Sequence, residues 1–112
     1  MSRTIKFRAW EKTAHHMINN IVVTNTGTVM FGLPNREYEI MQFTGLFDKS
    51  GKEIWEGDIV HCTLRATGQE IYVVEWIEVT AEFSIQNKGI CEKYLEVIGN
   101  IYENLDLLEG KE

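Results

Sequence analysis

Apolar and polar residues alternate in short runs along most of the chain. Segment 4–10 places its apolar residues on one parity and its cations on the other, with Ile5, Phe7 and Ala9 facing away from Lys6 and Arg8. Alternation with a period of two predicts a half-buried β-strand. Further strands are predicted at 39–43, 59–64, 70–76, 82–86 and 96–102, and a hairpin at 17–23 and 28–31. No long segment has a helical period, so the pattern predicts a mainly β chain.

Turn-forming residues separate these runs, as in small barrels and sandwiches. The strongest turn signal is the segment Asp48 to Gly51, with Asp at the first position and Gly at the fourth. A second turn is predicted at Gly57 and Asp58, where glycine allows positive φ and the aspartate accepts backbone N–H groups. We interpret the acidic residues around it as structural rather than catalytic. Near the end of the chain, Asn104 is predicted to cap one helical turn.

Composition and charge narrow the class of protein. The 112 residues are enough for one ordinary globular domain, and the net charge of −6 opposes a whole-molecule attraction to nucleic acid. Residues 1–12 nevertheless carry a net charge of +3, whereas residues 13–112 carry −9. This basic strand is the candidate interaction surface, formed by Arg3, Lys6, Arg8, Trp10 and Lys12. It could contact a phosphate backbone, or the acidic body of a second copy.

Side chains with catalytic or metal-binding chemistry are few. Cys62, Cys91, His15, His16 and His61 have no zinc-site spacing, and no third residue orients a nucleophile–base pair, so we expect no metal, no cofactor and no catalysis. The stretch 13–35 contains no Asp, Glu, Lys or Arg, but its Asn, His and Gly residues make it too polar for a bilayer. With no signal peptide and no disulfide framework, the expected location is the cytoplasm, without membrane contact.

Three blocks of sequence keep a recognisable order. The first is Ile5-Lys6-Phe7-Arg8-Ala9-Trp10, followed by Met17; the second is Met41-Gln42-Phe43-Thr44-Gly45-Leu46, continuing from Asp48 to Val60; the third is Val97-Ile98-Gly99-Asn100-Ile101-Tyr102-Glu103-Asn104. Together they resemble the YopX protein family. The chain departs from the family pattern at Phe43, where Tyr is typical, and at Leu105, where Pro is common. The blocks supply the residues expected to have structural roles: Gly45, Asp48, Gly51, Trp55, Gly57, Asp58, Gly99 and Asn100.

The resemblance implies a single YopX-like domain, with an SH3-like small β-barrel at 37–112, a β-rich extension at 1–36 and a short C-terminal helical turn. Members of this family are encoded mainly by bacteriophages and prophages, which implies the cytoplasm of a bacterial host. We therefore expect a non-catalytic accessory protein that forms homo-oligomers and binds another macromolecule, whose identity the sequence does not give. The alternative is a nucleic-acid-binding SH3-like module that uses the basic N-terminal strand.

Overall fold

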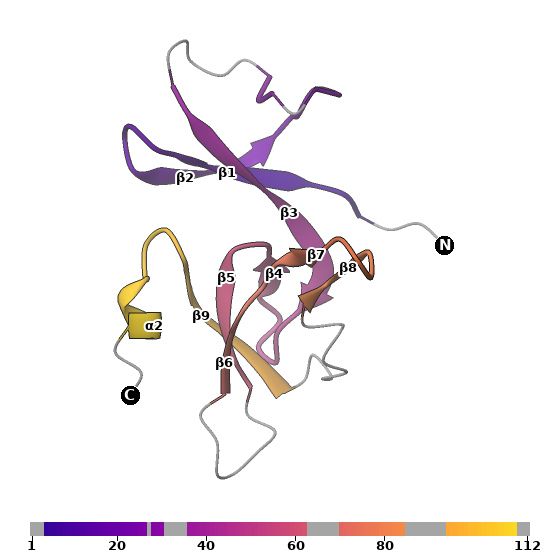
Figure 1. The fold of residues 1–112 in the computed structure, drawn as a ribbon, viewed down its shortest axis with the longest axis vertical. Helices are drawn as coiled ribbons and strands as arrows, with labels where there is room; N and C mark the ends of the chain where they lie inside the picture. The colour runs from indigo at the N-terminus through magenta and orange to yellow at the C-terminus, as the bar shows by residue number, and fades with distance from the viewer. Residues whose placement is uncertain (1–3, 27, 31–35, 63–69, 85–93, 110–112) are drawn as a thin grey trace. The chain divides into compact units, whose positions relative to one another are not determined.

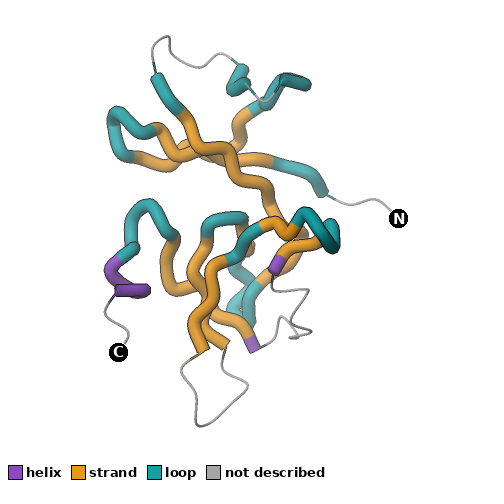
Figure 2. The backbone as a smooth tube through the Cα atoms, in the orientation of Figure 1, coloured by secondary structure: helices purple, strands orange, loops and turns teal. Residues whose placement is uncertain are grey.

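A computed structural model describes residues 4–26, 28–30, 36–62, 70–84 and 94–109. The described residues are mainly β, as predicted, with strands separated by short loops and turns (Figures 1 and 2). The elements are β1 (Phe7–Glu11), β2 (His16–Ile21), β3 (Tyr38–Phe47), β4 (Glu53–Trp55), β5 (Asp58–Cys62), β6 (Glu70–Val73), β7 (Trp76–Ile77), β8 (Glu82–Phe83), β9 (Leu95–Asn100) and α2 (Asp106–Glu109). The chain divides into two compact units, unit 1 with residues 1–43 and unit 2 with residues 44–112, and the boundary lies inside β3.

Unit 1 is an antiparallel arrangement in the order β2-β1-β3. The middle strand β1 is buried on both of its parities, from Arg8 to Glu11, whereas the sequence predicted only one buried face. Opposite Arg8, strand β2 accommodates an extra residue, since Phe7 pairs with Ile21 but Ala9 pairs with Ile18. This β-bulge places Asn20 at a φ of 58°, a conformation that asparagine tolerates better than most residues.

The hairpin predicted at 17–23 and 28–31 is only partly present. Strand β2 pairs with β1 instead, through the four-residue loop 12–15. Among its described residues, the hairpin has one bridge, between Val23 and Val29, with backbone bonds from Met30 N to Val22 O and from Thr24 N to Thr28 O. Residues 27 and 31 lie outside the described residues. We call residues 22–26 and 28–30 the side loop.

Unit 2 contains the end of β3, which pairs with β4 across the predicted Asp48–Gly51 turn, and the sheet β6-β5-β9. Its core is a cluster of buried side chains from different strands: Ile54, Val60, Cys62, Val74, Phe83 and Leu95. The described strands form open sheets of four, three and two strands. Among the described residues no helix has the length and hydropathy needed to span a bilayer.

Two local predictions in unit 2 were wrong. Segment 70–76 is not one strand: it is interrupted between β6 and β7, where the Ser84 hydroxyl donates to Val73 O at 3.0 Å and accepts from Glu75 N at 3.1 Å. The Asn104 side chain does not cap α2. Its Oδ1 accepts a bond from Asn100 N at 3.1 Å and so closes the preceding turn, while the Asn104 carbonyl accepts from Leu107 N.

Candidate binding site on unit 1

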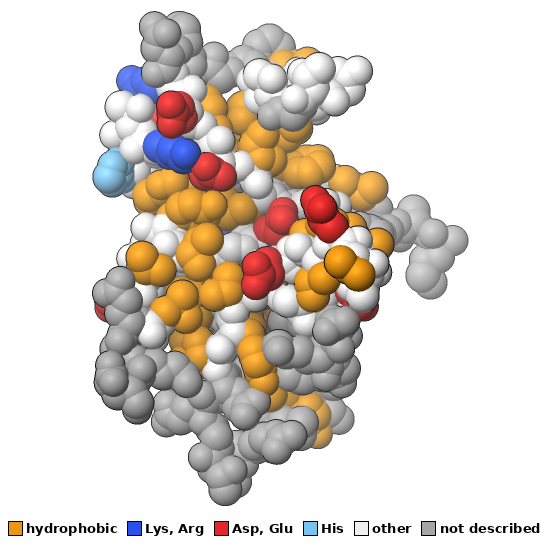
Figure 3. Space-filling model, in the orientation of Figure 1, with side chains coloured by type: hydrophobic (Ala, Val, Ile, Leu, Met, Phe, Trp, Pro, Cys, Tyr) orange, Lys and Arg blue, Asp and Glu red, His pale blue; other side chains and the backbone are white. Residues whose placement is uncertain are grey.

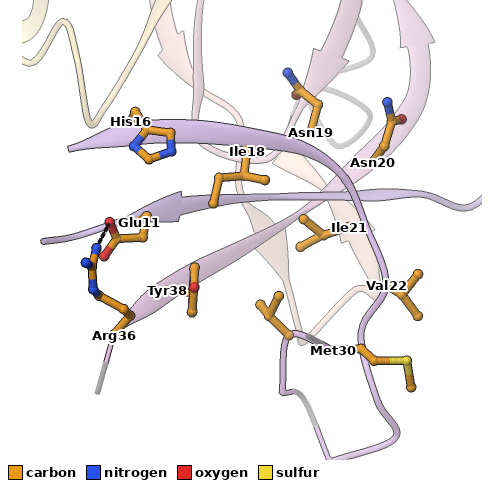
Figure 4. A pocket seen from close by; sticks show the side chains of 11 residues that line it. Glu11, His16, Ile18, Asn19, Asn20, Ile21, Val22, Met30, Arg36 and Tyr38 are labelled. Carbon is orange, nitrogen blue, oxygen red and sulfur yellow. Dashed lines mark hydrogen bonds and ion pairs between the residues drawn. The ribbon is translucent and has the colours of Figure 1, made fainter. Parts of the chain in front are cut away.

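One face of the unit 1 sheet is hollowed by a pocket of about 350 Å³. Figure 4 shows its lining, in which Ile18 and Ile21 of β2 and Tyr38 of β3 form the centre. The side loop adds Val22, Val29 and Met30. The pocket therefore lies entirely within unit 1.

Strand register explains why these residues share a face. Glu11 pairs with His16 on β2 and with Tyr38 on β3, while Ala9 pairs with Ile18. The side chains of directly paired residues in antiparallel strands project from the same side of the sheet, so these side chains lie on one face.

The polar end of the pocket is a closed ion pair. The carboxylate of Glu11, which is only 1% exposed, accepts bonds from Thr13 N at 2.9 Å, Ala14 N at 2.8 Å and Arg36 NH1 at 3.1 Å. Burial raises the pKa of Glu11, but these backbone hydrogen bonds and the charge of Arg36 together lower it below its usual value. Glu11 therefore remains ionised, and each of its oxygens accepts at least one hydrogen bond. Figure 4 shows the bond to Arg36.

The charges of Glu11 and Arg36 cancel, and the lining contains no other Asp, Glu, Lys or Arg. Asn19 and Asn20 lie on the opposite side of the pocket from the ion pair (Figure 4). The exposed part of the rim combines apolar and polar side chains: Val22 is 56% exposed and Met30 is 42% exposed, and the polar residues His16, Asn19, Asn20 and Arg36 are exposed as well. The site thus combines an apolar centre with a neutral boundary.

The structure does not assemble the basic residues predicted for interaction into one accessible stripe. Arg8 and Trp10 are each only 8% exposed, and the Lys6 ammonium lies 4.9 Å from the centre of the Phe43 ring. Lys12 forms ion pairs with Glu39 at 2.8 Å and Glu37 at 3.7 Å. In Figure 3 the visible basic side chains lie beside acidic ones. Arg3 lies outside the described residues.

The predicted turn residues act as hydrogen-bonding centres in unit 2. Asp48 accepts bonds from Ser50 N at 2.8 Å, Lys52 N at 2.9 Å and Val97 N at 3.0 Å, which ties the β3–β4 turn to β9. Burial raises the pKa of Asp48, but the three bonds outweigh it, and the pKa falls below its usual value. Gly51 has the positive φ expected of the turn, at 87°.

The other structural residues also hold turns together. Asp58 accepts the Trp55 N–H at 2.8 Å, as predicted, and Gly57 has a φ of 86°. Asn100 Oδ1 accepts from Tyr102 N and Glu103 N, both at 2.9 Å. Trp55 is buried, Gly45 has a φ of 89°, and Gly99 packs against the Asn104 side chain. Their contacts are local to the turns and strand ends of unit 2.

Sequence reasoning missed the pocket, although a signal for it was present. The longest stretch without charged residues coincides with β2 and the side loop, which line most of the pocket. Within the described part of the chain, no three His, Cys, Asp or Glu side chains gather in a way that could hold a metal ion. Cys62 is buried in the core of unit 2, and Cys91 lies outside the described residues.

The class of protein follows from this arrangement: a mainly β chain of two small antiparallel units, in which glycine, aspartate and asparagine turns organise the second. The family model of the YopX protein matches residues 6–109. The chain belongs to the YopX protein family, which confirms the resemblance of the three sequence blocks. The crystal structure of protein EF1440 from Enterococcus faecalis is similar, with a TM-score of 0.70 and 26% identity over 96% of this chain and 99% of that one. No curated protein matches.

Proposed function

We propose that this protein is a non-catalytic binding module that associates with further copies of itself through the charge-free surface of unit 1. The observation that carries the proposal is the exposure of Val22 and Met30 beside an apolar pocket, within the stretch 13–35 that has no Asp, Glu, Lys or Arg. Contiguous exposed apolar side chains bordered by polar ones are typical of interaction sites.

Electrostatics supports this choice of surface. Copies of a chain with a net charge of −6 repel one another, and the repulsion is weakest where they meet through uncharged residues. Lys12 is already paired with Glu37 and Glu39 in its own chain, which reduces what the basic strand can offer to a second copy. We therefore place the contact on the side loop and the edge strand β2.

The chemistry of the pocket supports binding rather than catalysis. A general acid at neutral pH needs a raised pKa, whereas the pKa of Glu11 is lowered. A general base needs a lone pair that can reach a substrate proton, and the Glu11 oxygens already accept backbone and arginine hydrogen bonds. The same holds for Asp48 in unit 2.

The resemblance that led to the family supports two further parts of the proposal. We propose that the strands of unit 2 curve into an SH3-like barrel, and that the protein is an accessory protein of phages or prophages in the bacterial cytoplasm. The binding of nucleic acid receives no support from the described basic residues, because Arg8 is buried and Lys12 is paired.

Light scattering across a concentration series tests self-association. We expect the mass to rise above 13.0 kDa with concentration, and Val22→Lys or Met30→Lys to shift it back toward 13.0 kDa, since a buried unpaired charge opposes contact. Val79→Lys is the matched control, because Val79 is 95% exposed and lies in unit 2. A wild-type mass of 13.0 kDa at every concentration would contradict the proposal, and so would an equal effect of all three substitutions.

A further inference from the structure

The unit 1 pocket is present within a single chain, and its lining includes β2 and the side loop, where the contact between copies is proposed. Its volume of about 350 Å³ lies within the range of small-molecule sites, which runs from roughly 300 to 1,000 Å³. Two devices hold it open. Glu11 fixes the loop 12–15 through Thr13 and Ala14, and the Val23–Val29 bridge fixes the side loop.

Water is a poor occupant of the centre of this pocket. By the share of liquid volume that a water molecule takes, about 30 Å³, the space corresponds to about twelve waters. An ordered water needs two to four polar partners, roughly, and Ile18, Ile21 and Val29 supply none from their side chains. An apolar molecule that displaces this water is stabilised by the area it removes from solvent.

The charge of the boundary restricts the occupant further. Arg36 is neutralised by Glu11, and Glu11 is itself satisfied by two backbone N–H groups. An anion would find its arginine already paired, and a cation would find its carboxylate already bonded. Either would lose hydration without a counter-charge, which is costly at an apolar site.

We infer that the pocket formed by β2, the side loop and Tyr38 is a binding site for an uncharged, predominantly apolar small molecule of about two to three fused or linked rings. This goes beyond the proposed self-association, because it assigns a ligand class to the interior of one chain. The neutral ion pair at one end sets the preference against charged compounds.

A pair of fluorescent probes with the same rings tests both parts of the inference. N-phenyl-1-naphthylamine is uncharged, whereas 1-anilinonaphthalene-8-sulfonate carries a sulfonate. We expect saturable one-to-one binding of the uncharged probe, with an affinity for the sulfonate at least about tenfold weaker. Val29→Trp places a large side chain in the pocket and should lower the affinity for the uncharged probe by about tenfold or more. The matched control Val79→Trp should leave that affinity unchanged.

Methyl NMR of the wild-type protein provides a measurement that needs no variant. The uncharged probe should shift the methyl signals of Ile18, Ile21 and Val29 and leave that of Val79 unchanged. Three results would each overturn the inference: no saturable binding of the uncharged probe, tighter binding of the sulfonate probe than of the uncharged probe, or shifts of the Val79 methyl signals without shifts of the pocket signals. The probes are titrated at a protein concentration at which light scattering gives a mass of 13.0 kDa, because a contact through β2 and the side loop would cover the pocket. Under that condition the ligand site and self-association fail separately.

Discussion

Gly57 has a backbone conformation that residues with a Cβ adopt only under strain. Its φ is 86°, and two backbone hydrogen bonds hold this conformation. The Gly57 N–H donates to Val74 O at 2.7 Å, and the Gly57 carbonyl accepts from Ile101 N at 2.9 Å. Gly57→Ala should lower the free energy of unfolding by about 1–2 kcal/mol, and Gly57→Val by at least as much, since neither can leave this conformation without losing the bonds. Urea unfolding measures the change.

The reverse substitution is available at Ala81, which has a φ of 55° at the end of the β7–β8 loop. Ala81→Gly relieves strain but gives the unfolded chain more freedom, so its stability should be equal to the wild type or up to about 1 kcal/mol greater. A loss of stability at Ala81 similar to that at Gly57 would show that positive φ is not what determines either effect.

Because of Asp48, the stability of unit 2 should depend on pH in the acidic range. A carboxyl whose pKa is lower in the folded than in the unfolded state stabilises the fold above the unfolded value, and this contribution is lost as the pH falls through the folded-state pKa. Because the pKa of Asp48 is lowered, wild-type stability should decline below about pH 3.9, the ordinary aspartate value. Asp48→Asn should cost about 1–3 kcal/mol at neutral pH and flatten that decline.

Urea unfolding over a pH series measures both effects of Asp48→Asn. Asp106→Asn is the control, because it removes one exposed carboxylate on α2 and none of the bonds to β9. An acid dependence unchanged from wild type in Asp48→Asn would mean that the bonds to Ser50, Lys52 and Val97 do not stabilise the ionised form.

At the scale of elements, the C-terminal turn depends on Gly99 for space. A Cβ at this position would lie 2.6 Å from Asn104 Oδ1, the atom that accepts the Asn100 N–H. Gly99→Ala should therefore cost about 1–3 kcal/mol, by displacing Asn104. Asn104→Ala alone should cost about 1 kcal/mol for the lost bond.

The double variant of Gly99→Ala and Asn104→Ala distinguishes crowding from a general glycine effect. Because Asn104→Ala removes the obstructing side chain, the double variant should lose less stability than the sum of the single variants. Thermal unfolding of the four proteins gives the coupling, and strict additivity would contradict the role assigned to Asn104.

The turns of unit 2 could be predicted from the sequence because their signals are local. Asp48 and Gly51 are three residues apart in the sequence, and Asp58 accepts a hydrogen bond from Trp55 N at the same sequence separation. The reach of Asp48 to Val97 could not be predicted, because the two residues are 49 positions apart and only the fold brings them together. Local patterns specify turns but not the partners of their carboxylates.

The pairing of strands was less predictable for the same reason. An apolar run at 17–23 is compatible with pairing to either neighbour in sequence, and only the burial of the whole sheet selects β1. The pocket was missed because it needs that register, together with the bulge at Asn20, to bring β2 and the side loop around a cavity. The break within 70–76 depends on the distant Ser84 hydroxyl.

At the scale of the whole molecule, the uneven charge of the sequence is reduced by contacts within unit 1. The +3 of residues 1–12 includes Lys12, which pairs with Glu37 and Glu39, and Arg8, which is buried. Lys6 contacts the Phe43 ring. The positive electrostatic potential that a polyanion would meet at this strand is therefore weaker than its sequence implies. Residues 13–112 still carry a net charge of −9.

We consequently expect single-stranded DNA or RNA to bind no more tightly than micromolar at about 0.15 M salt, because unpaired acids repel phosphates within a Debye length of roughly 8 Å. Fluorescence anisotropy of a labelled oligonucleotide over a salt series measures this. Charge reversal at Lys6 and Lys12 should change the affinity little, as should the matched reversal of Lys49 in unit 2, which lies near Glu96 at 3.9 Å. Nanomolar binding with a log–log salt slope near about −3, abolished by the reversals at Lys6 and Lys12 but not at Lys49, would instead mean that about four cations of the basic strand contact phosphates. That result would make nucleic-acid binding the better account of this strand. Such a slope requires the release of counterions by several cations. Lys12 in its ion pairs and Arg8 in its buried position could not release them, so the strand would have to rearrange.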